Sequence, residues 1–321
     1  MENGKLKIMK RTILSIALAL MSLTLFAANT TFLPITVMVE NLTEPFPAGA
    51  KALMESKLTQ VLTKNGIAGL DYQGQFALTV VAVPIDKDII AGPPAKIAEK
   101  MELNLYVVDL YNRTIFSSTA INVRGLGETE TKSYVDAIRR MPVQSKALSQ
   151  FIEEGKAKII DYYDAKAPTI IKKAQALCQQ KEFGEALHLL TMIPEECKYY
   201  DEALREGVKV YQAYVDNLCN INMAAARQAW AAEQNSQGAR KAGEYLAQIL
   251  PDAACYGEAM ELYKEIKSKV LDDWKFEMKI YQDGVDIEKE RIKAMRDIGV
   301  AWGEHQPKQT YQLDFLPAFR R

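Results

Sequence analysis

The sequence predicts an α+β domain at the N-terminal end, followed by an all-α helical-repeat domain with a long C-terminal helix. Residues 32–141 alternate between strand-like and helix-like stretches, whereas the chain from 142 onward shows helical spacing of its apolar residues almost throughout. Part of the helical half also occurs twice at a fixed offset. With 48% hydrophobic and 25% charged residues, the composition is that of a globular protein and excludes disordered or collagen-like chains.

Residues 1–27 are expected to be a secretory signal peptide. Lys5, Lys7, Lys10 and Arg11 precede an apolar run at 13–26, and small residues follow it. This run is shorter than the roughly 20 residues that a membrane span needs, although an uncleaved anchor is the alternative. We therefore expect an exported protein of the periplasm, with no stable membrane span once the signal is removed.

The predicted N-terminal domain, 28–141, has the element order β-α-β-β-β-α. Ile35, Val37 and Val39 alternate with Thr36, Met38 and Glu40, as in a strand with one buried face. The spacing over 50–64 predicts a helix. It should end at Asn65-Gly66, because glycine suits the left-handed cap position.

The rest of this domain reads as three strands and a helix. Strands are expected at 76–85, 103–110 and 115–123, and the last two should form a hairpin that turns at Asn112-Arg113. Gly92-Pro93-Pro94 predicts another turn. Thr129 or Thr131 can then cap a helix that runs to about residue 140.

Several of these stretches carry a family resemblance. The opening strand ends in Val39-Glu40-Asn41, a late strand reads Leu105-Tyr106-Val107-Val108-Asp109, and the next strand ends in Gly125-Leu126-Gly127 before a helix. Together with the helix that carries Leu58 and Leu62 and ends at Gly66, they resemble the small α/β domain of curli-secretion and penicillin-binding-protein-activator lipoproteins of the bacterial envelope. The resemblance implies an envelope protein with that domain. The chain departs from these families in having no lipid-anchor cysteine, and Leu110-Tyr111-Asn112-Arg113 stands where a glycine is usual.

Gly125 and Gly127 have two interpretations. A Gly-x-Gly before a helix can hold a phosphate at the helix N-terminus. This one lacks a third glycine, and Glu128 beside it would repel a phosphate. The pair therefore favours a structural turn from strand to helix.

Residues 142–263 resemble degenerate tetratricopeptide-like helical repeats. Lys181-Glu182-Phe183-Gly184-Glu185-Ala186-Leu187 has the turn and second helix of such a unit. A second copy aligns at an offset of 56, and the loop prolines Pro194 and Pro251 differ by 57. The matched pairs are Ala186 and Ala242, Leu190 and Leu246, Tyr200 and Tyr256, Glu202 and Glu258, and Ala203 and Ala259. Such repeats bury their apolar stripes by stacking and usually present a protein-binding surface. The alternative is that the two units form a compact bundle without a binding groove.

Residues 264–305 are expected to form one long, coiled-coil-like helix, followed by an apolar tail at 306–321. Val270, Trp274, Met278, Tyr281 and Val285 follow each other at steps of three and four. This seam can either oligomerise or pack on the preceding repeats. The tail can pack back on the protein or dock elsewhere.

The cysteines are all in the helical half, at Cys178, Cys197, Cys219 and Cys255. Four cysteines in an exported protein permit three complete disulfide pairings, and buried free thiols are the alternative. Their wide spacing does not support a zinc site.

No stretch of the sequence indicates a catalytic, cofactor or metal site. The two histidines, His188 and His305, lie in no HExxH motif, and phosphate-loop, dinucleotide and GxSxG motifs are absent. The net charge of −1 does not suggest nucleic-acid binding. Aromatic residues are common at protein interfaces, so the candidate interaction surface is Tyr199, Tyr200, Tyr256, Trp274, Tyr281 and Trp302.

These observations predict an exported, non-enzymatic protein-interaction or assembly-adaptor protein of the bacterial cell envelope, without a cofactor, whose partners are envelope proteins. A structural subunit of an oligomeric envelope assembly is the alternative, in which the long helix makes a homo-oligomer. A hydrolase of a type without a sequence motif is the third hypothesis.

Overall fold

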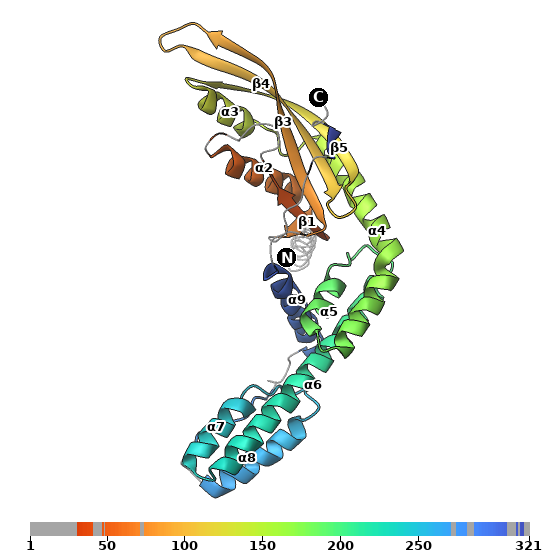
Figure 1. Ribbon diagram of the computed structural model, residues 1–321, viewed down its shortest axis with the longest axis vertical. Coiled ribbons are helices and arrows are strands. Elements are labelled where there is room, and N and C mark those ends of the chain that lie inside the picture. The colour runs from red at the N-terminus through yellow and green to blue at the C-terminus, as the bar shows by residue number, and fades with distance from the viewer. Residues whose placement is uncertain are drawn as a thin grey trace, which may run out of the picture.

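The computed structural model describes residues 31–40, 47, 49–70, 74–270, 274–280, 286–306, 313 and 315–317. The predicted signal peptide and Tyr281 lie outside this range. The chain folds into an elongated molecule with a sheet at one end and helices at the other (Figure 1). The predicted class, α+β followed by all-α, is confirmed.

The sheet has five strands in the order β2-β1-β3-β4-β5. β1 is parallel to both of its neighbours, whereas the β3–β4 and β4–β5 pairs are antiparallel. The N-terminal elements are β1 (Thr31–Met38), α2 (Ala50–Lys64), β2 (Ile67–Leu70), β3 (Phe76–Ile90), β4 (Lys96–Asp109), β5 (Thr114–Gly127) and α3 (Glu130–Arg139). The short strand β2 is an addition to the predicted order.

Local signals place the ends of these elements. Gly66 ends α2 with a φ of 75°, and Thr129 caps α3 by accepting a hydrogen bond from the backbone N–H of Lys132. The β4–β5 hairpin turns where expected, and buried Asp109 accepts hydrogen bonds from the backbone N–H groups of Tyr111 and Asn112. The carboxylate thus stabilises the turn in which Arg113 has a φ of 52°.

Each face of the sheet is covered by different parts of the chain. One face packs on α2, α3 and the first half of α4 (Lys146–Gln179), and this core continues without a break into the helical region. On the opposite face, Tyr106 and Val108 form a smaller cluster with Leu313 and Leu316, which are fully buried. The described part of the C-terminal tail therefore packs back on the sheet, one of the two predicted possibilities.

The helical region follows α4 in alternating long and short helices (Figure 1). Ser145 caps α4, and the buried residues of α4 recur every three or four positions, as a helix with one buried stripe requires. The other helices are α5 (Phe183–Thr191), α6 (Tyr200–Ala232), α7 (Ser236–Leu246), α8 (Tyr256–Val270) and α9 (Ile287–Glu304).

The expectation of one long helix over 264–305 is wrong. α8 ends at Val270, residues 274–280 are not helical, and α9 begins at Ile287. Along 274–280, Trp274 and Met278 are buried and Phe276 is half-buried, whereas the residues between them are exposed. Burial at every second residue is the pattern of an extended chain. The apolar residues therefore pack on the preceding helices instead of forming a helical seam.

Candidate interaction surfaces

One pair of cysteines forms a disulfide. Cys219 in α6 is bonded to Cys255 just before α8, with their Cα atoms 6.0 Å apart. Cys178 and Cys197 are free thiols, and Cys197 is buried. Burial raises the pKa of Cys197 to about 11, and the nearby Asp164 carboxylate also raises it.

The two sequence repeats have the same local structure. We call α5 with the first half of α6 the first repeat, and α7 with α8 the second repeat. The turn after α5 is held by Asp164, which accepts a hydrogen bond from the backbone N–H of Lys198 at 3.0 Å. In the turn after α7, Asp216 accepts one from Ala254, the residue 56 positions later than Lys198, at 2.8 Å. The offset read from the sequence is therefore a structural repeat.

Residues 274–280 and 286–306, here called the return segment, lie against both repeats. In its extended part, Trp274 packs against Gly243 of α7 and stacks on Phe276, with ring centroids 5.2 Å apart. Tyr263 of α8 lies 5.4 Å from the Trp274 ring. The hydroxyl of Tyr256 donates a hydrogen bond to the Lys279 carbonyl. These contacts attach the extended part to the second repeat.

The helical part, α9, lies on the first repeat. The Trp302 ring covers Gly184, where an added Cβ would lie 2.4 Å from its Cδ1 atom. Gly299 packs on the backbone of Leu187, and Met295 fills the space beside Gly207. Glycines on both sides of the interface therefore permit a close approach of the helices.

His188 is enclosed by this contact. Its Nδ1 atom lies 3.0 Å from the Gly299 carbonyl, and its ring lies 5.0 Å from the Trp302 ring. Burial lowers the pKa of His188. The Gly299 carbonyl and Glu185 act in the opposite direction and offset this lowering only in part. The other histidine, His305, is exposed after the end of α9.

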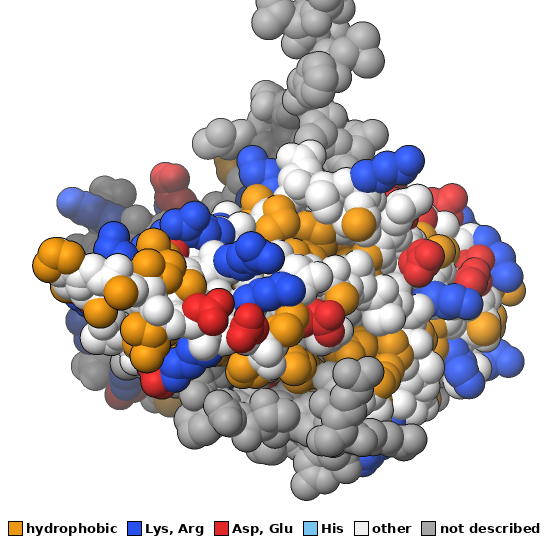
Figure 2. All heavy atoms as spheres, turned by 90° about the horizontal axis from the view of Figure 1, so that it is seen from above, with side chains coloured by type: hydrophobic (Ala, Val, Ile, Leu, Met, Phe, Trp, Pro, Cys, Tyr) orange, Lys and Arg blue, Asp and Glu red, His pale blue; other side chains and the backbone are white. Residues whose placement is uncertain are grey.

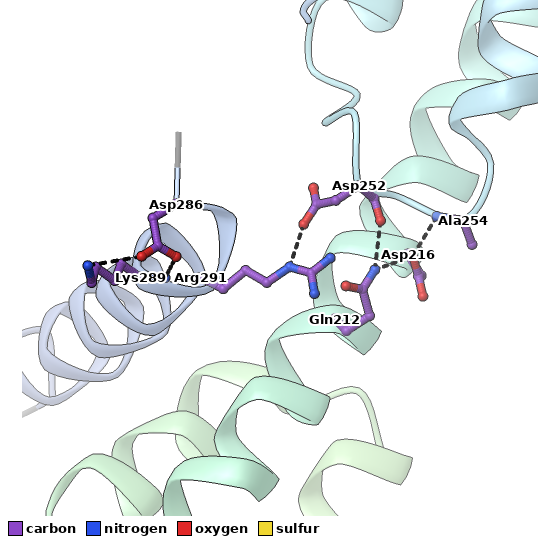
Figure 3. Close-up of polar contacts among 7 residues, drawn as sticks. All are labelled: Gln212, Asp216, Asp252, Ala254, Asp286, Lys289 and Arg291. Carbon is purple, nitrogen blue, oxygen red and sulfur yellow. Dashed lines mark hydrogen bonds and ion pairs between the residues drawn. The ribbon is translucent and has the colours of Figure 1, made fainter. Parts of the chain in front are cut away.

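Two arginines of α9 bind the turns of both repeats. Arg291 Nε lies 2.8 Å from Oδ2 of Asp252, whose side chain is only 6% exposed (Figure 3). Arg296 Nη2 lies 3.1 Å from Oε1 of Glu195 and also contacts the Tyr200 hydroxyl. Glu195 and Asp252 each follow the loop proline of their repeat, so the two ion pairs occupy equivalent positions.

The Asp252 turn is also tied to α6. The Gln212 side-chain amide donates hydrogen bonds to the Asp252 carbonyl and to the Asp216 carboxylate, both at 3.0 Å (Figure 3). At the start of α9, Asp286 caps the helix through the Lys289 backbone N–H. Arg291 therefore binds a turn whose backbone is already fixed to α6.

Four of the six aromatic residues of the candidate interaction surface lie in the contact between the return segment and the repeats. Trp274 is buried, and Tyr256 and Trp302 are half-buried in the contacts given above. Tyr200 is half-buried, joined to Arg296 and Glu195, and Tyr199 is half-buried before α6. The candidate surface is therefore largely internal, and Tyr281 is outside the described residues.

Sequence reasoning missed the arginines and their acidic partners. The repeat alignment carried a usable signal for the acids, since Glu195 and Asp252 share the offset of the prolines before them. No local signal identified Arg291 and Arg296 among the other exposed-face charges of the helix.

A second surface lies at the far end of the sheet, where β3 and β4 extend past the helices (Figure 1). Every residue from 84 to 96 is exposed. We call this stretch the hairpin end. Its isoleucines Ile85, Ile89 and Ile90 are 47%, 77% and 50% exposed. Figure 2 looks down on this end of the molecule and shows hydrophobic side chains at the surface, with lysine and arginine side chains between them. The turn from Ala91 to Ala95 adds further apolar residues without a charge.

An open cavity of about 450 Å³ lies beside the hairpin end. It is bounded by the last residues of β5, by Lys96 and by the exposed side of α3. Lys132 and Arg139 line it, and Lys132 forms an ion pair with Glu128. The neighbouring glycines are structural, as predicted: a Cβ on Gly125 would lie 1.8 Å from the Ser133 carbonyl oxygen. Their role is to let β5 contact α3 directly.

The described residues contain no group of three or more His, Cys, Asp or Glu side chains that could hold a metal ion. None of the helices in the described ranges is both long enough and apolar enough to cross a bilayer.

Comparisons with known proteins identify no family. No protein-family model matches the chain, and no curated protein matches it. A minor lipoprotein from Acinetobacter baumannii is similar over 40% of this chain and 94% of its own, with 14% identity and a TM-score of 0.24. A candidate lipoprotein from Caulobacter crescentus is similar over 42% of this chain and 91% of its own, with 11% identity and a TM-score of 0.20. Both TM-scores are too low to assign a shared fold.

Proposed function

We propose that this protein is an exported, non-enzymatic adaptor of the bacterial cell envelope, and that the hairpin end is its docking element for an envelope protein. The observation that carries the proposal is the run of exposed residues from 84 to 96, which includes three exposed isoleucines. Clustered apolar side chains at the surface of a soluble protein are a common mark of interaction sites. The adjoining cavity with Lys96 and Arg139 adds a charged rim of the kind that interfaces have.

The alternative of an oligomeric structural subunit rested on a long helix with a free apolar seam. Trp274 of that seam is buried against the protein's own second repeat, and Met278 is buried in the same core. They are therefore not available for contact with another copy in this structure, and the hairpin end is the stronger candidate.

A photo-crosslinking experiment in the producing cell tests the adaptor function. A photoreactive residue at Ile89 should yield one crosslinked envelope protein, and the same residue at exposed Lys158 on α4 should yield none. Ile90→Glu should abolish the Ile89 crosslink, because a charge replaces an apolar contact, while thermal stability stays unchanged. Equal crosslinking from Ile89 and Lys158, or a crosslink that survives Ile90→Glu, would contradict the proposal.

A further inference from the structure

The return segment occupies matching places on the two repeats. Trp274 lies against Gly243 and Tyr263 in the second repeat. In the first repeat, α9 lies against Leu187 and Gly207, each 56 positions earlier than its counterpart. The occupants themselves differ, since one is extended and the other is a helix. Equivalent positions of the two repeats therefore bind another part of the chain, whether that part is extended or helical.

The charged contacts follow the same repeat. Asp252 and Glu195, one in each turn, bind Arg291 and Arg296 of a single helix. Because the two carboxylates bind residues 291 and 296, they favour a helix that carries arginines five positions apart. Arginine suits such sites because its guanidinium group stays charged and offers several N–H donors to a carboxylate.

α9 is lightly held by apolar contacts. Only Met295, Gly299 and Gly303 are buried among its 18 residues, and Ala294, Ile298 and Trp302 are half-buried. Met295 is therefore its one large side chain that is fully buried. A cavity of about 20 Å³ remains where Met295 and Arg296 face α6. The ion pair of Arg296 with Glu195 is about half exposed, and such pairs contribute little to stability. α9 is therefore bound to the first repeat with few large apolar side chains fully buried.

We propose that the face of the first repeat, with Glu195 and Asp252 at its margins, is a docking site for a helix of a partner protein, and that α9 occupies it as an internal competitor. The partner helix should carry two arginines five positions apart, a small residue where Gly299 lies and an aromatic residue where Trp302 lies. This site is separate from the hairpin end, and it specifies the chemistry of a partner that the adaptor function leaves open.

A partner helix fits the observations better than a second copy of this chain. Exchange with a second copy would have to release the whole return segment, including buried Trp274 on the second repeat, and also Leu313 and Leu316 of the tail on the sheet. A partner helix has to displace only α9, in which Met295 is the one large side chain that is fully buried.

A labelled peptide tests the site. The probe is a fluorescent peptide of residues 286–306, and its matched control carries Arg291→Glu and Arg296→Glu. The proteins are the full exported chain and its Trp302→Ala variant, in which α9 loses the ring over Gly184. The apparent affinity for the probe is the intrinsic affinity multiplied by the fraction of sites that α9 leaves free, so Trp302→Ala should bind the probe about tenfold more tightly than the wild type. The control peptide should bind neither protein.

Three results would overturn the proposal. The first is a folded Trp302→Ala variant that binds the probe no more tightly than the wild type. The second is equal binding of both peptides, since the carboxylates would then select nothing. The third is a Trp302→Ala dimer in sedimentation, which would assign the site to a second copy.

A second variant and one further control complete the test. Should Trp302→Ala unfold, Arg296→Ala loosens α9 through a half-exposed side chain and should show the same gain in probe binding. Ile90→Glu at the hairpin end should leave probe binding unchanged. A failure of the adaptor function and a failure of this site therefore give different results.

Discussion

Gly125 and Gly127 show how single residues set the distance between two elements. Both lie in β5 where it meets α3, and an added Cβ on Gly127 would lie 2.4 Å from the backbone nitrogen of Ser133. The atoms nearest each added Cβ belong to the α3 backbone or are Cβ atoms attached to it, so no flexible side chain could move aside. The Gly-x-Gly pattern thus has a packing role at the edge of the sheet.

We expect Gly125→Ala to destabilise the protein by about 1–3 kcal/mol or more, because β5 and α3 must separate to admit the methyl group. Gly92→Ala is the matched control in the hairpin turn, where the new Cβ meets only an ordinary contact at 3.6 Å. Urea unfolding followed by circular dichroism measures both. Equal midpoints for the two variants would show that the contact is not tight.

The buried thiol of Cys197 should be nearly unreactive. Its pKa of about 11 lies two units above the ordinary value of 9.0, so the thiolate fraction in the folded protein is about 100-fold lower. Iodoacetamide at pH 8 should label Cys197 about 100-fold more slowly in the native than in the denatured protein. Half-buried Cys178 is the internal comparison, and mass spectrometry of peptides separates the two. Equally fast labelling of both thiols in the native protein would contradict this.

At the scale of elements, contacts join helices that are distant in the sequence. The Cys219–Cys255 disulfide is a covalent one, between α6 and the residue before α8. It closes 36 residues of sequence separation across the second repeat. Restricting the unfolded chain in this way stabilises proteins by about 2–4 kcal/mol.

The double variant Cys219→Ser, Cys255→Ser should therefore lower the free energy of unfolding by about 2–4 kcal/mol. Cys178→Ser is the control, since it removes a half-buried free thiol. Chemical denaturation of both variants measures the difference. A double variant as stable as the control would mean that the second repeat does not need the bond.

We expect the protein to lose stability in acid at the contact between α9 and the first repeat, where His188 is enclosed. The pKa of His188 is lowered from 6.5 in the folded protein, because burial disfavours the imidazolium ion. The unfolded chain then binds more protons as the pH falls below about 6.5, so stability is complete above that pH and is lost as the pH falls through the lowered pKa.

Thermal unfolding at pH 7.5 and 5.5 measures this loss. His188→Gln keeps a hydrogen-bond donor for the Gly299 carbonyl without the charge and should show a smaller drop in Tm. Equal drops in the two proteins would assign the acid sensitivity to other groups.

The sequence predicted most elements but not those with ambiguous local patterns. Residues Trp274 and Met278 are four apart, and that spacing places two side chains on one side of a helix and equally on one side of an extended chain. Phe276 between them was the discriminating signal, since a helix would turn it away. Strand β2 was missed because Ala68 and Gly69 are weak strand formers in a four-residue run. It forms only through parallel pairing with β1.

At the scale of the whole molecule, α4 belongs to both ends. Gly155 and Tyr163 pack beneath the sheet, at Val107 and Phe76, whereas Ala174 belongs to the core that continues into the repeats. The sequence could show two compositions but not this shared helix. It also could not show the return of the chain to the sheet, because local periodicity carries no information on long-range partners.

Because of the shared helix, Leu187→Asp in α5 should weaken the sheet as well as the repeats. A carboxylate in a fully buried site is expected to cost several kcal/mol, and its effect reaches the sheet through α4. Hydrogen exchange of β3 and β5 peptides measures the spread, with Glu182→Asp as an exposed control. Unchanged protection of the sheet in Leu187→Asp would show two independent folding units.

The return segment also decides how the molecule would respond to tension. If one body were attached at the hairpin end and another at the second repeat, pulling them apart would stretch the protein along its long axis (Figure 1). That load would pass through α4, and also through the chain that runs back from Trp274 past α9 to Leu316 on the sheet. The two paths lie in parallel, so neither carries the whole force. A protein braced in this way can keep two attached bodies at a fixed spacing while the structures around them move.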